Sequence, residues 1–235
     1  MNKMKMRKYL YGRWGEGLRS LGAFLRDCVF PEGALCRGCG KISDGSPLCP
    51  ACRERLQTED VARAWTFTAV EPDLPAYSLR PHTGLARQMV LNLKHQSEAC
   101  LAAEMARLIL PLPAWLVLSP DTVVTWVTMP RRRLRRRGID HGRLLAEAAA
   151  ECLHLPCRQL LLRTNDHARS QARLNQAGRV RNLVGVFSPK EHISFPVLLV
   201  DDVLTTGTTA RRCAEALRRG GAREIMVLTF TKAVR

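Results

Sequence analysis

Apolar runs and helical periods alternate along the second half of this chain. Residues 197–200 form an unbroken run of branched apolar side chains, which is typical of a parallel strand buried on both faces. A helical pattern follows it and ends at Gly220 and Gly221. Further strands are predicted at 123–129, 159–163 and 224–231, and a further helix at 140–152. The alternation predicts an α/β fold with a twisted, mostly parallel sheet and helices on both faces.

The first half of the chain carries a second set of predicted elements. Two short strands are predicted at 65–70 and 76–80, around a turn that contains proline. Helices are predicted at 84–94 and 98–110, and a proline-marked linker at 111–120 closes this part of the chain.

The N-terminal segment is basic and amphipathic. Residues 1–26 are rich in lysine and arginine, and apolar side chains between Leu18 and Cys28 fall at helical spacing, so a short helix is predicted to end before Pro31. One interpretation is a contact with DNA, a membrane surface or a protein partner. The other is a helix packed on the next segment, with a solvated start.

Four cysteines form two Cys-x-x-Cys pairs, Cys36 with Cys39 and Cys49 with Cys52, separated by nine residues. Each pair lies on a tight turn, so the four thiolates can surround a zinc ion as a tetrahedron. Because all four positions are filled, we expect a closed, structural Zn2+ site on which folding of this segment depends. The alternative is four free cysteines. Cys28 lies outside the pattern and is predicted to be a small core residue.

Composition narrows the class of protein. The 235 residues are 46% hydrophobic and 25% charged, as in a globular protein, but the formal charge of +16 favours a polyanionic partner. Nine cysteines, unevenly spaced, fit a reducing compartment with a metal site better than a disulfide framework. Neither a signal peptide nor a transmembrane segment is evident, so a cytoplasmic protein is expected.

Acidic and hydroxyl side chains follow the apolar run at 197–200. Asp201 and Asp202 come first, and four threonines then surround Gly207. These threonines are Thr205, Thr206, Thr208 and Thr209. Converging backbone N–H groups and a helix N-terminus favour a phosphate, while the carboxylates could accept hydrogen bonds from sugar hydroxyls or hold a metal. The predicted ligand is a sugar phosphate; the alternative is an Asx-capped turn between a core strand and a surface helix.

Six arginines follow the predicted strand at 123–129, between Pro130 and Gly138. Such a strand-to-helix loop lies at the carboxyl edge of an open sheet, where ligands bind. We expect diphosphate to bind there, at Arg131, Arg132 and Arg133; the alternatives are a nucleic-acid patch and a solvated cluster. The polar, basic stretch at 164–182 is long enough for a mobile lid.

The sequence at 197–209, Val-Leu-Leu-Val-Asp-Asp-Val-Leu-Thr-Thr-Gly-Thr-Thr, resembles the 5-phosphoribosyl-1-diphosphate (PRPP) binding motif of type I phosphoribosyltransferases. The resemblance implies that Asp201 and Asp202, the catalytic pair, hold the ribose 2- and 3-hydroxyls. It also implies that residues 205–209 bind the 5-phosphate and that Mg2+ acts with PRPP as a cofactor.

The wider arrangement is similar to the ComF family of competence-associated proteins, which join a zinc knuckle to a phosphoribosyltransferase domain. The matching parts are the four paired cysteines, the segment around Tyr77, and residues 84–94, 131–141, 171–187 and 197–209. The resemblance implies a role in natural competence or in the use of external DNA, with single-stranded DNA or DNA-processing proteins as partners. The family's usual Arg-Gly-Phe-Asn-Gln reads Arg-Gly-Ile-Asp140-His141 here, so an acceptor contact by that amide pair is not carried over.

Four segments and two functions follow from these patterns. The segments are a basic N-terminal part at 1–35, the zinc knuckle at 36–57, a hood-like connection packed on the core at 58–120, and the phosphoribosyltransferase-like domain at 121–235. One function is that of an enzyme that transfers the ribosyl group of PRPP to a nitrogen nucleophile. The other is that of a DNA-handling factor that keeps the phosphoribosyl site as a sensor or a remnant.

Overall fold

The computed structural model describes residues 35–58, 65–96, 99–110, 112–113, 116–163 and 186–234. The chain divides into two compact units, Met1–Pro50 and Ala51–Arg235. In the described part of the first unit, Leu35 forms an antiparallel bridge with Ile42. The predicted basic helix at 1–26, Cys28 and the predicted lid at 164–182 lie outside the described residues.

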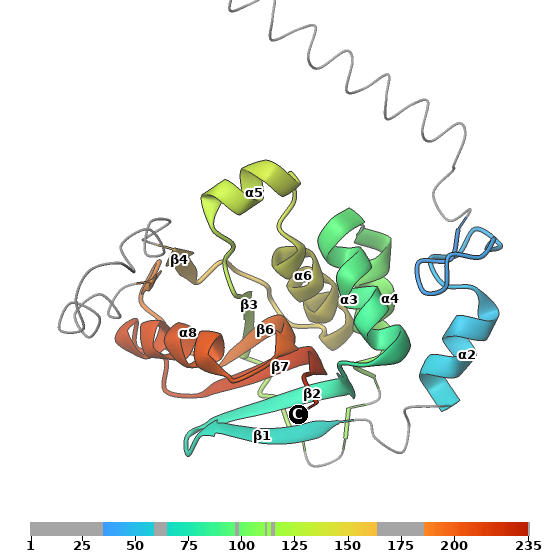
Figure 1. Ribbon diagram of the computed structural model, residues 1–235. Helices are drawn as coiled ribbons and strands as arrows, with labels where there is room; N and C mark the ends of the chain where they lie inside the picture. Colours follow the sequence, from blue (N-terminus) through green and yellow to red (C-terminus); the bar gives the residue numbers. More distant parts are fainter. Residues whose placement is uncertain are drawn as a thin grey trace, which may run out of the picture. The chain divides into compact units, whose positions relative to one another are not determined.

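A five-stranded sheet organises the second unit, with the strand order β1-β2-β7-β6-β3 (Figure 1). The strands are β1 (Thr66–Glu71), β2 (Leu74–Pro81), β3 (Val123–Trp126), β6 (Val197–Leu204) and β7 (Ile225–Lys232). β2, β7, β6 and β3 are parallel, and β1 is antiparallel to β2. This topology confirms the mostly parallel sheet expected from the alternation of apolar and helical segments.

Helices cover the sheet on both faces. On one face, Val197 and Leu199 of β6 share a core cluster with Cys213 and Leu217 of α8 (Thr208–Arg219). On the other, α6 (His141–Leu153) contacts β3 and β6, and α3 (Gly84–Gln96) contacts β2 and β7. Figure 1 shows β6 and β7 between α8 and α6. Successive side chains of a strand point to opposite faces, which explains why 197–200 is apolar at every position.

Shorter elements complete the described structure. α2 (Pro50–Thr58) starts at the last residue of the first unit and continues into the second, and α4 (Ala99–Arg107) packs on α6. β4 (Leu161–Arg163) and β5 (Phe187–Pro189) form a separate antiparallel pair, in which the guanidinium of Arg163 lies 5.1 Å from the ring centroid of Phe187. Within the described residues, no helix combines the length and the apolar character that a bilayer span requires.

The strand that carries the acid pair is longer than its apolar run predicted. β6 continues through Asp201 and Asp202 to Leu204, which pairs with Lys232 of β7. Aspartate is a poor strand former on its own, but β7 here offers a continuous parallel ladder of hydrogen bonds. The two acids therefore lie within the strand, not after it.

One other segment differs from expectation. The arginines predicted on a loop form a short helix, α5 (Arg131–Arg137), which begins after Pro130 and ends at Gly138. The segment at 58–120 contains β1 and β2, which belong to the sheet. The limits of the four predicted segments stay a prediction.

Candidate functional site

The turn after β6 presents its hydroxyl groups to solvent. Gly207 has φ +74°, a left-handed conformation that suits glycine, and α8 begins at the next residue. Thr205, Thr206, Thr208 and Thr209 are all exposed around it, and the Thr206 and Thr208 hydroxyls lie 2.8 Å apart. The predicted phosphate-binding residues therefore form an open turn at the N-terminus of a twelve-residue helix.

The acid pair is split between the two faces of the sheet, because Asp201 and Asp202 are consecutive residues of one strand. Asp201 is half-buried, and its Oδ1 accepts a hydrogen bond of 2.9 Å from the backbone N–H of Asp202. Burial, with repulsion from Asp202, raises the pKa of Asp201 to about 7. A carboxyl group with this pKa can lose or hold a proton near neutral pH.

Asp202 is buried and engaged on both carboxylate oxygens. Its Oδ1 lies 2.9 Å from Nζ of Lys94, and its Oδ2 lies 3.2 Å from Nε2 of His141. Burial alone would raise the pKa of Asp202, but the hydrogen bonds and charges of His141 and Lys94 lower it below its ordinary value. The second acid is therefore held as a carboxylate by two partners from α3 and α6.

His141 connects the Asp202 carboxylate to α5, the arginine helix. Nη1 of Arg137 lies 3.2 Å from Nδ1 of His141. Because a guanidinium only donates, Nδ1 accepts this hydrogen bond, and Nε2 carries the ring proton that points to Asp202. Asp140, the neighbouring residue, caps α6 by accepting hydrogen bonds from the backbone N–H groups of Gly142 and Arg143.

Sequence reasoning missed Lys94 as a partner of the acid pair. A signal was present: Val90, four residues earlier on α3, is fully buried, so Lys94 lies on the inward side of the same helix. His141 was noticed as a departure from the usual family sequence, but its contact with Asp202 depends on how α6 packs on β6.

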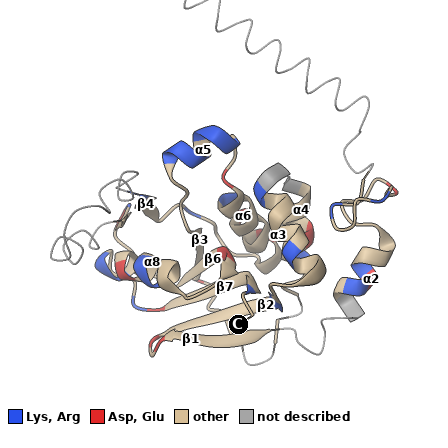
Figure 2. Ribbon diagram, viewed as in Figure 1, with Lys and Arg blue, Asp and Glu red and all other residues tan. Residues whose placement is uncertain are grey.

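The arginine helix stands at the carboxyl end of β3, the strand that pairs with β6 (Figure 2). Arg131, Arg132 and Arg133 are exposed, and α5 has no buried residue. Parallel strands bring their carboxyl ends to the same edge of a sheet, so α5 and the turn at 205–209, called the phosphate turn below after its predicted role, follow neighbouring strands at that edge. The structure thus places the acids within β6, the turn directly after β6, and the arginines on the helix that follows the neighbouring strand β3.

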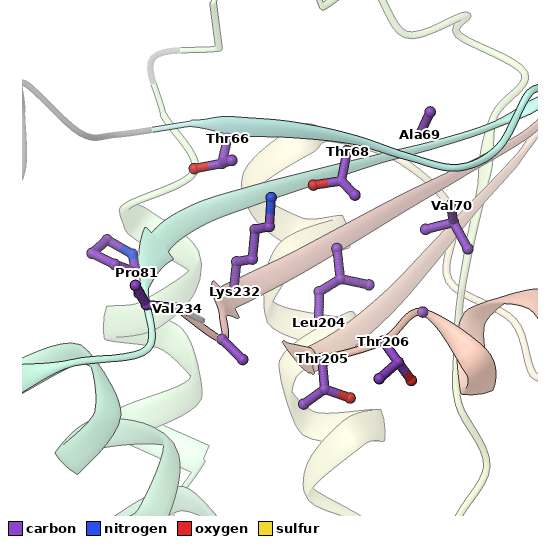
Figure 3. A pocket seen from close by; sticks show the side chains of 12 residues that line it. Thr66, Thr68, Ala69, Val70, Pro81, Leu204, Thr205, Thr206, Lys232 and Val234 are labelled. Carbon is purple, nitrogen blue, oxygen red and sulfur yellow. The ribbon is translucent and has the colours of Figure 1, made fainter.

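A cavity of about 570 Å³ opens beside the phosphate turn (Figure 3). Its walls come from β1, from the turn, and from the end of β7 with the two residues after it. The lining residues are Thr66, Thr68, Ala69, Val70, Pro81, Leu204, Thr205, Thr206, Gly207, Lys232, Ala233 and Val234. No element of the sequence pattern predicted this cavity, because its walls meet only when β1 is folded against α8.

Ion pairs fix the wall that β1 supplies. Glu71, the last residue of β1, pairs with Nε of Arg211 at 3.3 Å and with Nη1 of Arg218 at 3.0 Å. Asp73 pairs with Nη2 of Arg218 at 2.9 Å. A Cβ built on Gly207 would lie 2.7 Å from Cγ1 of Val70, so β1 crosses the turn in direct contact with it.

The four predicted metal ligands are gathered in space. The Sγ atoms of Cys36, Cys39, Cys49 and Cys52 all lie within 4.8 Å of one another. Sγ of Cys36 accepts hydrogen bonds from the backbone N–H groups of Gly38 and Cys49, at 3.3 and 3.2 Å. Burial opposes ionisation, but backbone N–H groups outweigh it and lower the pKa of Cys36 to about 6. Four sulfur donors at this separation fit a tetrahedral metal ion such as zinc.

Comparison with known proteins gives relatives along most of the chain. The chain is 26% identical to competence protein F of Haemophilus influenzae over 212 residues, which are 86% of this chain and 92% of that protein. It is 27% identical to the DNA utilization protein YhgH of Salmonella typhimurium over 204 residues, 82% of this chain and 88% of that protein. No family model matches the chain. These relatives confirm the resemblance to competence-associated proteins.

Two solved structures are similar to parts of this chain. A glutamine PRPP amidotransferase from B. subtilis, complexed with ADP and GMP, is 21% identical and matches 64% of this chain and 28% of its own, with a TM-score of 0.37. Adenine phosphoribosyltransferase from Leishmania donovani is 13% identical and matches 71% of this chain and 86% of its own, with a TM-score of 0.39.

Proposed function

We propose that this protein binds PRPP with Mg2+ and transfers its phosphoribosyl group to a nitrogen nucleophile. One observation carries the proposal: the exposed threonine turn around Gly207 joins a strand with two acids to the N-terminus of a helix. This arrangement supplies donors for a phosphate and acceptors for sugar hydroxyls within a few residues. The motif resemblance at 197–209 names PRPP, a ligand that carries both a phosphate and sugar hydroxyls.

The roles of the residues follow from their chemistry. The backbone N–H groups and hydroxyls of residues 205–209 hold the 5-phosphate. Asp201 and Asp202 hold the ribose hydroxyls, and Asp202 exchanges its ion pair with Lys94 for this contact. Mg2+, which prefers oxygen ligands, would neutralise the negative charge of the diphosphate when bound.

Charge governs the transfer step. The bond from the anomeric carbon to the diphosphate oxygen breaks, and the electron pair leaves with the diphosphate. The nitrogen lone pair forms the new bond to that carbon, and the nitrogen then loses a proton. Arg131, Arg132 and Arg133 stabilise the departing diphosphate, and the carboxylates stabilise the positive charge at the anomeric carbon.

Calorimetry with a series of ligands tests the proposal. With Mg2+ present, PRPP and ribose 5-phosphate are expected to bind, and ribose is expected not to bind, because the turn recognises the phosphate. Release of diphosphate from PRPP, screened against nitrogen nucleophiles, then reports turnover. Binding of none of the three ligands at millimolar concentration would overturn the proposal.

A matched pair of variants tests the diphosphate contact. Arg132→Ala with Arg133→Ala removes two charges that we assign to the diphosphate, and Arg135→Ala with Arg136→Ala removes two from the same helix. The first variant is expected to weaken binding of free diphosphate about tenfold or more, and the second much less. Equal losses would assign the effect to general electrostatics.

The zinc and DNA assignments belong to the same proposal. The four-cysteine cluster holds Zn2+ in a closed structural site, in a cytoplasmic protein whose thiols stay reduced. A second function is favoured by the +16 charge and by the names of the relatives, which refer to competence and DNA utilisation. As a DNA-handling factor the protein would bind DNA with an affinity that falls steeply as salt rises, and binding insensitive to salt would exclude this function.

A further inference from the structure

We infer that the cavity beside the phosphate turn receives an acceptor that carries a carboxylate or another anionic oxygen group, and that Lys232 selects for this group. That the ligand is an acceptor rests on the proposed function. That an anion binds in this cavity rests on the geometry of the cavity alone. The cavity, of about 570 Å³, is within the size range of small-molecule sites.

Lys232 gives the cavity its charge. It is the last residue of β7, pairs with Leu204 of β6, and is half-buried. It is the one charged side chain among the lining residues, and within the described structure its ammonium has no hydrogen bond or ion pair. Figure 3 shows this ammonium pointing toward the wall that carries Thr66 and Thr68. An uncompensated positive charge in a concave site attracts an anion.

Hydroxyl and apolar groups complete the recognition surface. Thr66 and Thr68 are two residues apart on β1, so their side chains lie on the same face of the strand and point into the cavity. The Thr68 hydroxyl is buried and has no hydrogen-bond partner among the described residues. Val70, Leu204 and Val234 supply apolar surface. The ligand class is therefore a small, partly apolar molecule with one anionic oxygen group.

The cavity and the phosphate turn share Thr205, Thr206 and Gly207. A molecule in the cavity would thus lie next to a sugar phosphate held by the turn. The wall of the cavity that β1 supplies is already held in place, because Glu71 of β1 is paired with Arg211 and Arg218 of α8. Pre-formed sites lose less free energy on binding than sites that must be ordered by the ligand.

Matched ligand pairs test the selectivity. Orotate with uracil, nicotinate with pyridine, and anthranilate with aniline differ within each pair only by the carboxylate. Calorimetry is run on the full chain, with and without PRPP and Mg2+. We expect at least one carboxylate to bind about tenfold or more tightly than its partner, because a charge-assisted hydrogen bond supplies that much.

Variants assign the preference to one residue. Lys232→Met is expected to abolish the preference for the carboxylate, and Lys232→Arg is expected to retain it. Lys190→Met, which removes an exposed lysine outside the cavity, is expected to leave the preference unchanged. Circular dichroism checks folding, and Lys232→Gln replaces the methionine variant if that variant fails to fold. A preference that is absent from the wild type, or that survives in the methionine and glutamine variants, overturns the inference.

Failure of the inference and failure of the proposed function have different signatures. If the wild type binds PRPP but shows no carboxylate preference, the inference alone falls. If it shows the preference, and loses it in Lys232→Met, but does not bind PRPP, the anion site stands and the phosphoribosyl function falls.

Discussion

Lys94 of α3 and Asp202 of β6 are joined by an ion pair of 2.9 Å between Nζ and Oδ1. The side chain of Asp202 is 9% exposed and that of Lys94 is 25% exposed, so water screens the pair only in part. His141 contacts the other oxygen of the same carboxylate. One acid thus ties two helices to the strand that leads into the phosphate turn.

Asp202→Asn should lower the free energy of unfolding by about 2 kcal/mol, because it leaves Lys94 half-buried without its counter-charge. Denaturant unfolding at pH 7 measures the loss, and Asp121→Asn, at an exposed aspartate, is the control. In a protein that already carries Asp202→Asn, Lys94→Met should lower the free energy of unfolding much less than it does in the wild type, because the two residues share one interaction. Fully additive losses would contradict the ion pair.

Asp201 should make the protein less stable as pH rises from about 4 to about 7. Its native pKa of about 7 exceeds the value of an unfolded aspartate, so between these values the native state holds a proton that the unfolded state has lost. Asp201→Asn cannot lose this proton and should flatten the slope. Unfolding from pH 5 to pH 8 measures it. Asp202, whose pKa is lowered, acts below this window. Identical slopes in wild type and variant would refute the assignment.

Gly207→Ala should destabilise the protein by about 1 to 3 kcal/mol, because it adds a Cβ against Val70 to a residue with φ +74°. Gly138→Ala is the matched control: its φ is +80°, but nothing lies within 4 Å of its Cβ. The difference in melting temperature between the two variants isolates the clash. Val70→Ala added to Gly207→Ala should recover part of the loss, and no recovery would mean that β1 does not cross the turn.

Cys36→Ser with Cys39→Ser should remove the bound metal. Each substitution deletes one of four sulfur donors, and structural sites of this kind need all four. Elemental analysis of the purified protein should find about one zinc per wild-type chain and almost none in the variant. Cys100→Ser, at an exposed cysteine outside the cluster, should keep the metal. Equal zinc in the two variants would exclude the cluster as the site.

Features encoded by neighbouring residues were predictable from the sequence. The apolar run at 197–200, the glycine turn and the helix that ends at Gly220 lie in one continuous stretch, so their order fixes their arrangement. The paired cysteines are similar, because the spacing within each pair already sets the turn that brings two thiols together. Both features could be read with no knowledge of the rest of the fold.

Features that depend on distant residues were not predictable in this way. Asp202 meets Lys94 and His141 only because α3 and α6 both pack on the sheet. The extension of β6 to Leu204 depends on its ladder with β7, which overrides the local preference of two aspartates. Seven consecutive positions, six of them arginine, gave no apolar period, so α5 was expected as a loop.

β2 has a consequence for how this protein could be shortened or recombined. It lies between β1 and β7, and its parallel ladder with β7 runs from Ala76 to Pro81. A chain that began at residue 121 would leave β7, with its buried Leu228 and Phe230, as an unprotected outer strand prone to intermolecular association. The part at 121–235 is therefore not an autonomous module, and any gene fusion that transplants it must carry the hairpin at 66–81 as well.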